Sequence, residues 1–299
     1  MGNNHSHLKK HSAIKKIPKY DSKNLEQEKE LAHFLLNNID AIDRSHINHF
    51  MKRALFQNNF SSPIEDKLIK GECKVLDVGC GAGTWLLDLS NNYENSYFFG
   101  IDIKPIYPHE IKPKNVEFIK ADIFDGLSFS DNEFDFTHID TMSLVIEKEK
   151  WDFVLSELIR VTKPGGYIEI TDRSYDFVGE GPILRKLMTG VLKTYSKRNV
   201  DPEIISHFDS KLKLQPNISN VYRDEKIIIM GPNGDKLGLV LQDIAVSFYT
   251  SEMAIETLSN EFGISKEEYK NIVKIDLIEE LKQTNYENHF LRYWTQKCI

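Results

Sequence analysis

The stretch from Lys74 to Trp85 constrains the fold more than any other part of the chain, because it combines three kinds of local pattern. It begins with an apolar run, Val75 to Val78, which is typical of a strand buried on both faces of a parallel sheet. Glycines at positions 79, 81 and 83 follow, and a helical pattern begins directly after them. A strand, a glycine turn and a helix in this order open a nucleotide-binding βαβ unit, so an α/β fold is predicted.

The spacing of the glycines excludes two common nucleotide sites. The dinucleotide fingerprint needs a glycine at position 84, which is Thr84, and no Gly-Lys-Ser/Thr sequence follows that would form a P-loop. The stretch instead resembles the first motif of class I S-adenosylmethionine-dependent methyltransferases, acidic-x-Gly-x-Gly-x-Gly. Asp77, Gly79, Gly81 and Gly83 match that motif completely, and the resemblance implies that they bind the cofactor.

Two further acidic positions fit the same resemblance. Residues 97–103 form a predicted strand in which Asp102 lies 23 positions after Gly79, close to the spacing at which an acid meets a ribose in βαβ units. The family uses such an acid for the ribose hydroxyls, with Ile103 beside it. After a third strand at 116–119, Asp122 and Ile123 match an Asp that accepts from the adenine amino group and the amide that follows it. The alternatives are a solvated strand-end Asp102 and a turn Asp122.

The order of the next segments extends the resemblance to about residues 71–175. We expect a fourth strand at 134–139, a helix at about 148–162, a stop at Lys163-Pro164-Gly165-Gly166 and a fifth strand at 167–171. The resemblance therefore implies S-adenosylmethionine as the cofactor and a Rossmann-like, doubly wound, mostly parallel sheet of seven strands.

The segments on either side of this core are predicted to be helical. Residues 1–19 are interpreted as a disordered basic arm, and residues 20–70 as N-terminal helices, one from Asp21 and one from about Ser45, with a loop at 58–63. Residues 176–299 should complete the sheet. Helices are expected at 182–197 and from Asp201, a strand at 225–230, a turn at 231–234, helices at 237–262 and 265–283, and a last strand at 289–296. The helices between the last two strands resemble an insertion that builds the acceptor pocket.

Candidates for a general base lie after the predicted strands, where ligands bind in open α/β sheets. They are His138, Asp140, Asp172 and Tyr175. His138 is the first candidate, although a histidine there more often forms the wall of the cofactor pocket or belongs to the core. No Asn-Pro-Pro-Tyr follows the fourth strand, which disfavours methylation of nucleic-acid bases.

Charge argues against DNA or structured RNA as the substrate. The net charge is −7, and because residues 1–20 contain five lysines and no acid, the rest of the chain carries −12. An acidic body repels phosphate backbones. The three cysteines are too few and too scattered for a disulfide framework or a zinc site, so no metal is expected.

The overall layout is similar to fungal methyltransferases of the velvet-associated secondary-metabolism regulator type. One departure is that Ile139 and Asp140 follow His138, where that group tends to have a small residue and Arg. Three functions are therefore compared. The leading one is methyl transfer to a small-molecule or protein acceptor, and the second is a non-catalytic cofactor-binding regulator acting through partners. The third, a nicotinamide dehydrogenase, is disfavoured by Thr84.

The N-terminal arm suggests a location. Met1 to Ser6 fits the myristoylation pattern Met-Gly-x-x-x-Ser/Thr, with Gly2 as the acylated residue. One acyl chain needs a second signal for stable anchoring, which the five lysines of the arm would supply. We expect a cytoplasmic protein with peripheral membrane contact through residues 1–19 if Gly2 is acylated, and the fungal resemblance also allows a nuclear location.

Overall fold

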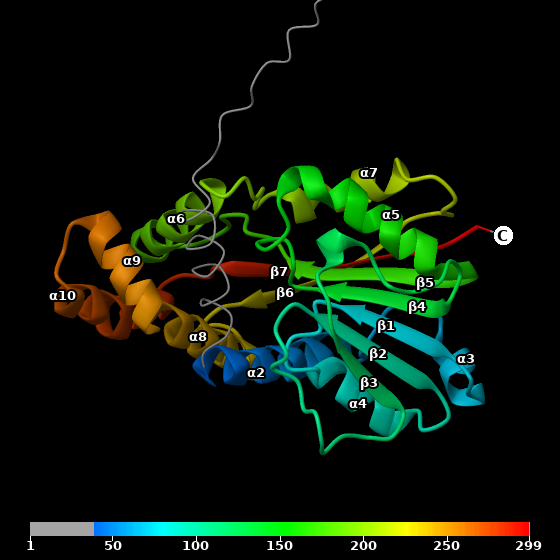
Figure 1. Cartoon of the computed structure of the whole chain (residues 1–299). Coiled ribbons are helices and arrows are strands. Elements are labelled where there is room, and N and C mark those ends of the chain that lie inside the picture. Colours follow the sequence, from blue (N-terminus) through cyan, green and yellow to red (C-terminus); the bar gives the residue numbers. More distant parts are fainter. Residues whose placement is uncertain (1–38, 299) are drawn as a thin grey trace, which may run out of the picture.

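The computed structural model describes residues 39–298 of the chain. One seven-stranded sheet with the order β3-β2-β1-β4-β5-β7-β6 runs through it (Figure 1). Neighbouring strands are parallel except at β7, which is antiparallel to both β5 and β6. The predicted Rossmann-like, mostly parallel sheet is confirmed. The strands are β1 (Lys74–Val78), β2 (Tyr97–Asp102), β3 (Val116–Lys120), β4 (Phe134–Asp140), β5 (Thr162–Arg173), β6 (Tyr222–Ile229) and β7 (Glu287–Gln296).

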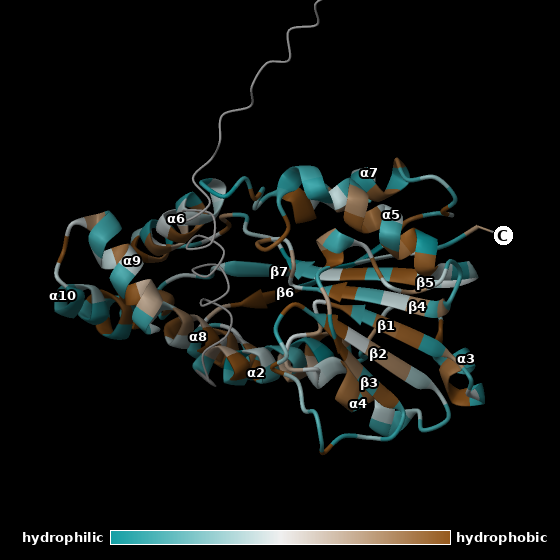
Figure 2. Cartoon of the chain, in the orientation of Figure 1, coloured by the Kyte–Doolittle hydropathy of each residue, from teal (hydrophilic) through white to brown (hydrophobic). Residues whose placement is uncertain are grey.

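Two apolar layers cover the two faces of the sheet (Figure 2). On one face α5 (Trp151–Val161) and α7 (Phe208–Lys213) pack against Leu76, Val78 and Ile170. On the other, α3 (Glu65–Lys70) and α4 (Thr84–Asn92) pack against Val75, Phe98 and Phe136. Because side chains alternate along a strand, consecutive residues of β1 contribute to different layers.

A helical lobe lies at one end of the sheet, on the left in Figure 1. It has its own apolar core, to which α2 (Ile39–Phe56) also contributes through Met51 and Phe56. Its other elements are α6 (Pro182–Ser196), α8 (Lys236–Tyr249), α9 (Glu252–Phe262), α10 (Lys266–Asn271), a π-helical segment (Ile272–Asp276) and α11 (Leu277–Leu281). The predicted helical insertion between the last two strands is thus present. No helix among residues 39–298 is long and apolar enough to cross a bilayer.

Several predicted boundaries were wrong. The helix predicted from Ser45 begins at Ile39, α3 was not predicted, and the helix predicted at 237–262 is interrupted after Tyr249. The helix predicted from Asp201 begins at Ile204, as a short 3-10 segment (Ile204–His207) ahead of α7. Two other 3-10 segments, at Ile123–Asp125 and Lys148–Lys150, follow β3 and precede α5.

The largest difference concerns Lys163-Pro164-Gly165-Gly166, which was predicted to be a turn. These residues belong to β5, and the register between β4 and β5 shifts between Phe134 and Phe136. Gly165 donates its N–H to the carbonyl of Lys297 at 2.9 Å, and Lys297 donates to Gly166 at 2.9 Å. Pairing with the end of the chain therefore keeps residues 163–166 in the strand, although their sequence is typical of a turn.

The predicted basic arm, its myristoylation pattern and the helix from Asp21 lie outside the described residues.

Candidate cofactor and acceptor site

The glycine loop after β1 has the backbone shape expected for a ligand cradle. Gly79, Gly81 and Gly83 have φ values of 75°, 54° and 76°, in the left-handed region that favours glycine. A Cβ atom at Gly81 would meet no other atom within 4 Å, so the loop faces open space there. A Cβ at Gly83 would lie 2.4 Å from Phe118, which explains why this position also needs glycine. The loop leads directly into α4.

Asp102 holds this loop against the end of β2. Its Oδ2 accepts the Gly81 N–H at 2.9 Å, and its Oδ1 accepts the Lys104 N–H at 2.9 Å. The carboxylate is partly exposed, so it lies beside the open side of the loop. The structure thus brings together Asp102 and the three glycines, as the sequence predicted.

The second predicted acidic position lies at the end of β3. Asp122 caps the short helical turn that follows, accepting the Phe124 N–H at 2.9 Å. Ile123 beside it is buried in the core, whereas Ile103 after β2 is exposed. Asp122 therefore has a local structural role, and one of its oxygens is free of this bond. Its contact with a ligand stays a prediction.

Asp77 and His138 form a buried pair below the loop. His138 Nδ1 lies 2.8 Å from Asp77 Oδ1, and the two residues are 1% and 4% exposed. Burial raises the pKa of Asp77, and the hydrogen bond to His138 opposes that rise. The His138 ring stacks on Trp85, with 4.0 Å between ring centroids. This packing favours His138 as a wall of the pocket over His138 as a general base.

Asp140, at the end of β4, is paired with a lysine from the N-terminal helix. Lys52 of α2 is buried, and its ammonium contacts the Asp140 carboxylate and lies 3.1 Å from Thr141 Oγ1. Burial alone would raise the pKa of Asp140, but the charges and hydrogen bonds of Lys52, His138 and Thr141 together hold this pKa below its usual range. Asp140 is therefore ionised, and the charge of Lys52 balances its own. A carboxylate with a lowered pKa is a weak base.

The other two candidate bases are also occupied. Asp172 is buried, and its oxygens accept the backbone N–H groups of Ser143 and Arg173 at 2.8 Å each. Burial raises the pKa of Tyr175, so its phenol is protonated at neutral pH. Of the four strand-end candidates, none combines exposure with an unengaged basic atom.

A buried ion pair fixes the N-terminal segment over the sheet. Glu169 of β5 is fully buried and accepts from the backbone N–H groups of Ser61 and Ser62 and from the Ser62 hydroxyl. Arg292 of β7 lies 3.7 Å from Glu169 and donates to the Asn58 carbonyl at 3.0 Å. The loop at 58–63, and α2 before it, are thereby held at the carboxyl ends of the strands.

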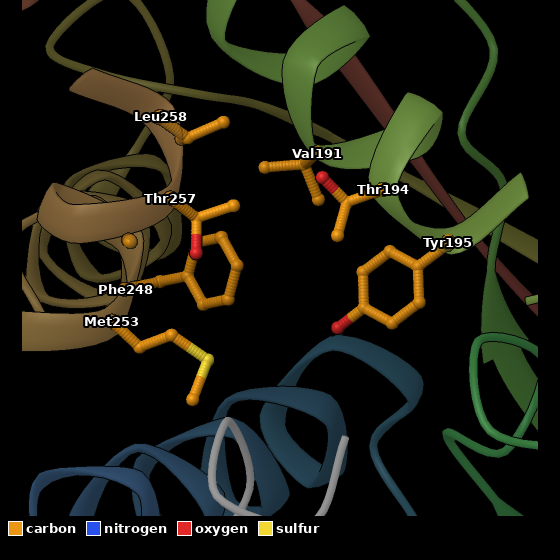
Figure 3. Close-up of a pocket in the computed structure, with 8 residues that line it drawn as sticks. Val191, Thr194, Tyr195, Phe248, Met253, Thr257 and Leu258 are labelled. Atoms are coloured by element: carbon orange, nitrogen blue, oxygen red, sulfur yellow. The ribbon is translucent and has the colours of Figure 1, made fainter. Parts of the chain in front are cut away.

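An apolar pocket lies in the helical lobe, between α6, α8 and α9 (Figure 3). We call it the acceptor pocket for the role that we propose for it; the empty space between its side chains, counted together with adjoining open solvent, is about 360 Å³. Tyr195 and Thr194 of α6 face Phe248 and Met253 across it (Figure 3). One side of the pocket, α8 and α9, belongs to the predicted insertion between the last two strands, whereas α6 precedes β6.

Sequence reasoning missed Lys52, Glu169 and Arg292. Lys52 stands in a helical pattern that looks like any polar helix face, and Glu169 and Arg292 alternate with apolar residues as outward-facing strand residues do. Only the path of the N-terminal segment over the sheet shows that these charges are buried. The role of Trp85 as the stacking partner of His138 also required the structure.

Comparison with known proteins shows that part of the chain is similar to methyltransferases. Residues 75–166 match the model of a methyltransferase domain. The N-methyltransferase verN of Clonostachys rogersoniana is 31% identical over 144 residues, which cover 47% of this chain and 50% of that protein. The chain thus spans about half the length of this relative. The secondary metabolism regulator laeA of Aspergillus niger is 27% identical over 104 residues, covering 34% of this chain and 27% of laeA.

The fold is shared with a solved methyltransferase structure. Phosphoethanolamine N-methyltransferase 2 of Haemonchus contortus, in complex with phosphomonomethylethanolamine and S-adenosylhomocysteine, superimposes with a TM-score of 0.50 at 17% identity. The match covers 89% of this chain and 59% of the other. At this identity the likeness concerns the fold alone.

Proposed function

We propose that this protein, whose residues 75–166 form a class I S-adenosylmethionine-dependent methyltransferase domain, transfers a methyl group to a small-molecule or protein acceptor. The observation that carries the proposal is the contact between Asp102 and the glycine loop. The Asp102 carboxylate accepts the Gly81 N–H at 2.9 Å and lies beside the open side of the loop. A carboxylate that can accept hydrogen bonds from a ribose therefore lies next to a loop whose three glycines have no side chains.

The residues present fit S-adenosylmethionine. We assign the ribose to Asp102, the adenine to Asp122 and Ile123 with Ile103 beside them, and the methionine part to the loop of Gly79, Gly81 and Gly83. We place Asp77 and His138, which form a hydrogen-bonded pair, beside the cofactor. The cofactor supplies a methyl group activated on a sulfonium, so the protein mainly contributes position and electrostatics.

The chain's own groups orient the acceptor and exclude water. Alignment of two reactants contributes up to about 7–11 kcal/mol to a barrier of this kind. Lys52 and the Glu169–Arg292 pair hold α2 and the loop at 58–63 over the strand ends, which closes one side of the site. Because the strand-end bases are engaged, we propose an acceptor that arrives with a free lone pair, such as an amine in its unprotonated form. The N-methyltransferase verN supports this choice.

The alternative is a non-catalytic regulator that binds S-adenosylmethionine and acts through protein partners. The similarity to laeA over 104 residues is the observation that favours it. Both functions require the same cofactor site, so cofactor binding does not separate them.

One experiment separates the two. The protein is incubated with methyl-labelled S-adenosylmethionine and an extract of the cells that produce it, and label is followed into small-molecule and protein fractions. We expect label in one fraction, and less label with the Asp102→Ala variant at a limiting concentration of S-adenosylmethionine. Binding of the cofactor without transfer to either fraction would contradict methyl transfer and support the regulator.

We also propose a cytoplasmic location, with membrane contact if Met1 initiates the chain and Gly2 is myristoylated. The support is the sequence of residues 1–19 alone. Fractionation of the wild type against Gly2→Ala, with the intact mass of the N-terminal peptide, tests it. Equal membrane fractions would leave only the cytoplasmic proposal.

A further inference from the structure

Arg173, the last residue of β5, lies over an aromatic ring near the helical lobe, as Arg44 and Arg198 also do. Its guanidinium lies 4.6 Å from the centre of the Tyr175 ring, and a side-chain hydrogen bond joins the two residues. Within residues 39–298, no carboxylate forms an ion pair with Arg173. By contrast, Arg185 also lies over an aromatic ring, that of Phe177, but pairs with Glu180, and Arg292 lies 3.7 Å from Glu169.

The Asp172 carboxylate accepts the backbone N–H of Arg173, whereas the side chains that act on the Arg173 guanidinium are tyrosines. Four buried tyrosines lie close enough for its charge to lower their pKa values, namely Tyr175, Tyr195, Tyr249 and Tyr286. Burial is the larger effect and raises all four pKa values, so the phenols are protonated at neutral pH. The Arg173 guanidinium thus lies among phenol groups without an ion-paired carboxylate, and guanidinium groups bind oxyanions through paired N–H donors.

The position of Arg173 connects the two halves of the site. Two residues earlier on the same strand face, Thr171 pairs in register with Asp140 at the carboxyl end of β4. On the other side, Tyr195 belongs both to the surroundings of Arg173 and to the lining of the acceptor pocket (Figure 3). Arg173 is partly exposed, so a ligand can reach it.

We propose that Arg173 and the tyrosines around it bind an oxyanion, a carboxylate or a phosphate group, of a small methyl acceptor whose apolar part lies in the acceptor pocket. This inference rests on the proposed function and narrows its acceptor to an amphipathic anion. Apolar lining from Val191, Phe248, Met253 and Leu258 provides the surface for the apolar part, and Arg173 provides the charge that selects among such molecules.

The test uses three probes with the same eight-carbon chain: octanoate, octyl phosphate and octanol. Each is titrated calorimetrically into the full-length protein in the presence of S-adenosylhomocysteine. We expect at least one anion to bind about tenfold to a hundredfold more tightly than octanol, the scale of hydrogen bonds to a charged group. The tighter of the two anions distinguishes a carboxylate from a phosphate. Equal binding of both anions and octanol by the wild type would overturn the proposal, and this comparison needs no variant.

Variants locate the effect. Arg173→Gln should remove the advantage of the anions over octanol while leaving octanol and S-adenosylhomocysteine binding unchanged, and Arg173→Lys should retain part of it. Arg223→Gln is the matched control, because Arg223 is exposed and also lies over an aromatic ring, and it should change nothing. Undiminished anion binding by a folded Arg173→Gln variant would overturn the assignment. Failure of the wild type to bind S-adenosylhomocysteine is a separate result that would overturn the proposed function instead.

Discussion

At Asp102, one carboxylate serves both the protein and the proposed ligand. Each of its oxygens already accepts one backbone N–H, from Gly81 and Lys104. A carboxylate oxygen has a second lone pair, so both oxygens keep the capacity to accept from ribose hydroxyls. The bonds to the protein fix the direction of that second lone pair. Asp102 is therefore preorganised by the same loop that it stabilises.

Replacing Asp102 by Ala should weaken binding of S-adenosylmethionine by about 1.5–3 kcal/mol, the scale of hydrogen bonds to a charged group. The loop also loses the acceptor for the Gly81 N–H, so part of the loss reflects a looser cradle. Calorimetry of wild type and variant measures it. Asp131→Ala removes an exposed carboxylate, paired with Arg160, and should leave binding unchanged. Wild-type affinity in the Asp102 variant would contradict the assignment.

Asp140 predicts a pH dependence of stability. Its pKa is held below the usual value mainly by Lys52, against the effect of burial. The folded protein thus binds this proton less tightly than the unfolded chain, whose Asp has a pKa of about 3.9. Ionised Asp140 therefore stabilises the fold above about pH 4, and this contribution is lost as the pH falls through the lower, folded pKa.

Urea unfolding of wild type and Asp140→Asn at neutral pH and at about pH 3 tests this sign. The wild type should exceed the variant in unfolding free energy by more at neutral pH than in acid. Asp131→Asn again provides the exposed control. A difference that stays constant with pH would show that the Lys52–Asp140 contact contributes no ionic stabilisation.

At the scale of elements, a band of buried polar residues ties the N-terminal segment to the sheet. In-register pairing aligns Asp77 with His138 across β1 and β4, and His138 with Glu169 across β4 and β5. The three side chains therefore share one face of the sheet. Glu169 receives the loop at 58–63 and Lys52 reaches the end of β4. The polar band, rather than apolar contact alone, determines where α2 lies.

Glu169→Ala should destabilise the fold by about 3–5 kcal/mol, because it leaves the buried Arg292 charge without its carboxylate. The N–H groups of Ser61 and Ser62 lose their acceptor as well. Glu169→Gln should cost less, since its amide oxygen still accepts. Urea unfolding measures both. Glu117→Ala, on the exposed face of β3, is the control for removing a strand glutamate; a loss at Glu169 no larger than at Glu117 would contradict the role given to this band.

Local sequence patterns predicted the elements that short-range signals determine. The strands β1, β2, β3 and β4, the helices α4 and α6, and the glycine loop follow from apolar periodicity and glycine spacing. The cap at Ser265, whose hydroxyl accepts the Glu268 N–H, also matched its sequence signature.

The errors occurred where contacts between residues far apart in the sequence determine the secondary structure. Residues 163–166 join β5 because the end of the chain pairs with them. The helix predicted at 237–262 breaks where Ser251 caps α9 by accepting the Ala254 N–H, although no glycine or proline marks the break. The candidate site showed the same difference. The position of Asp102 beside the glycine loop followed from sequence spacing. The burial of Lys52, Glu169 and Arg292 depends on the path of a segment far away in sequence.

At the scale of the whole molecule, the buried apolar residues of the described chain form three separate clusters. Two of them cover the faces of the sheet, and the third fills the helical lobe. Because the lobe has a core of its own, its surface residues can vary without disturbing the sheet that carries the glycine loop. The lobe core is nevertheless incomplete without α2, which supplies Met51 and Phe56. The proposed regions for acceptor choice and for cofactor binding thus belong to different clusters, which α2 joins.

Transfer of the lobe to a related methyltransferase should therefore move acceptor choice, provided that α2 moves with it. A graft of residues 39–56 together with 182–281 preserves the contacts of Met51 and Phe56 and should unfold at a temperature close to that of the host. A graft of 182–281 alone buries foreign side chains against the lobe core, and cavities or clashes of this kind cost about 1–3 kcal/mol or more. Thermal unfolding compares the two grafts, and label transfer from S-adenosylmethionine shows which acceptors each one uses. Acceptor choice that stays with the host sheet in the stable double graft would place specificity at the strand ends, beside Asp140 and Asp172, rather than in the lobe.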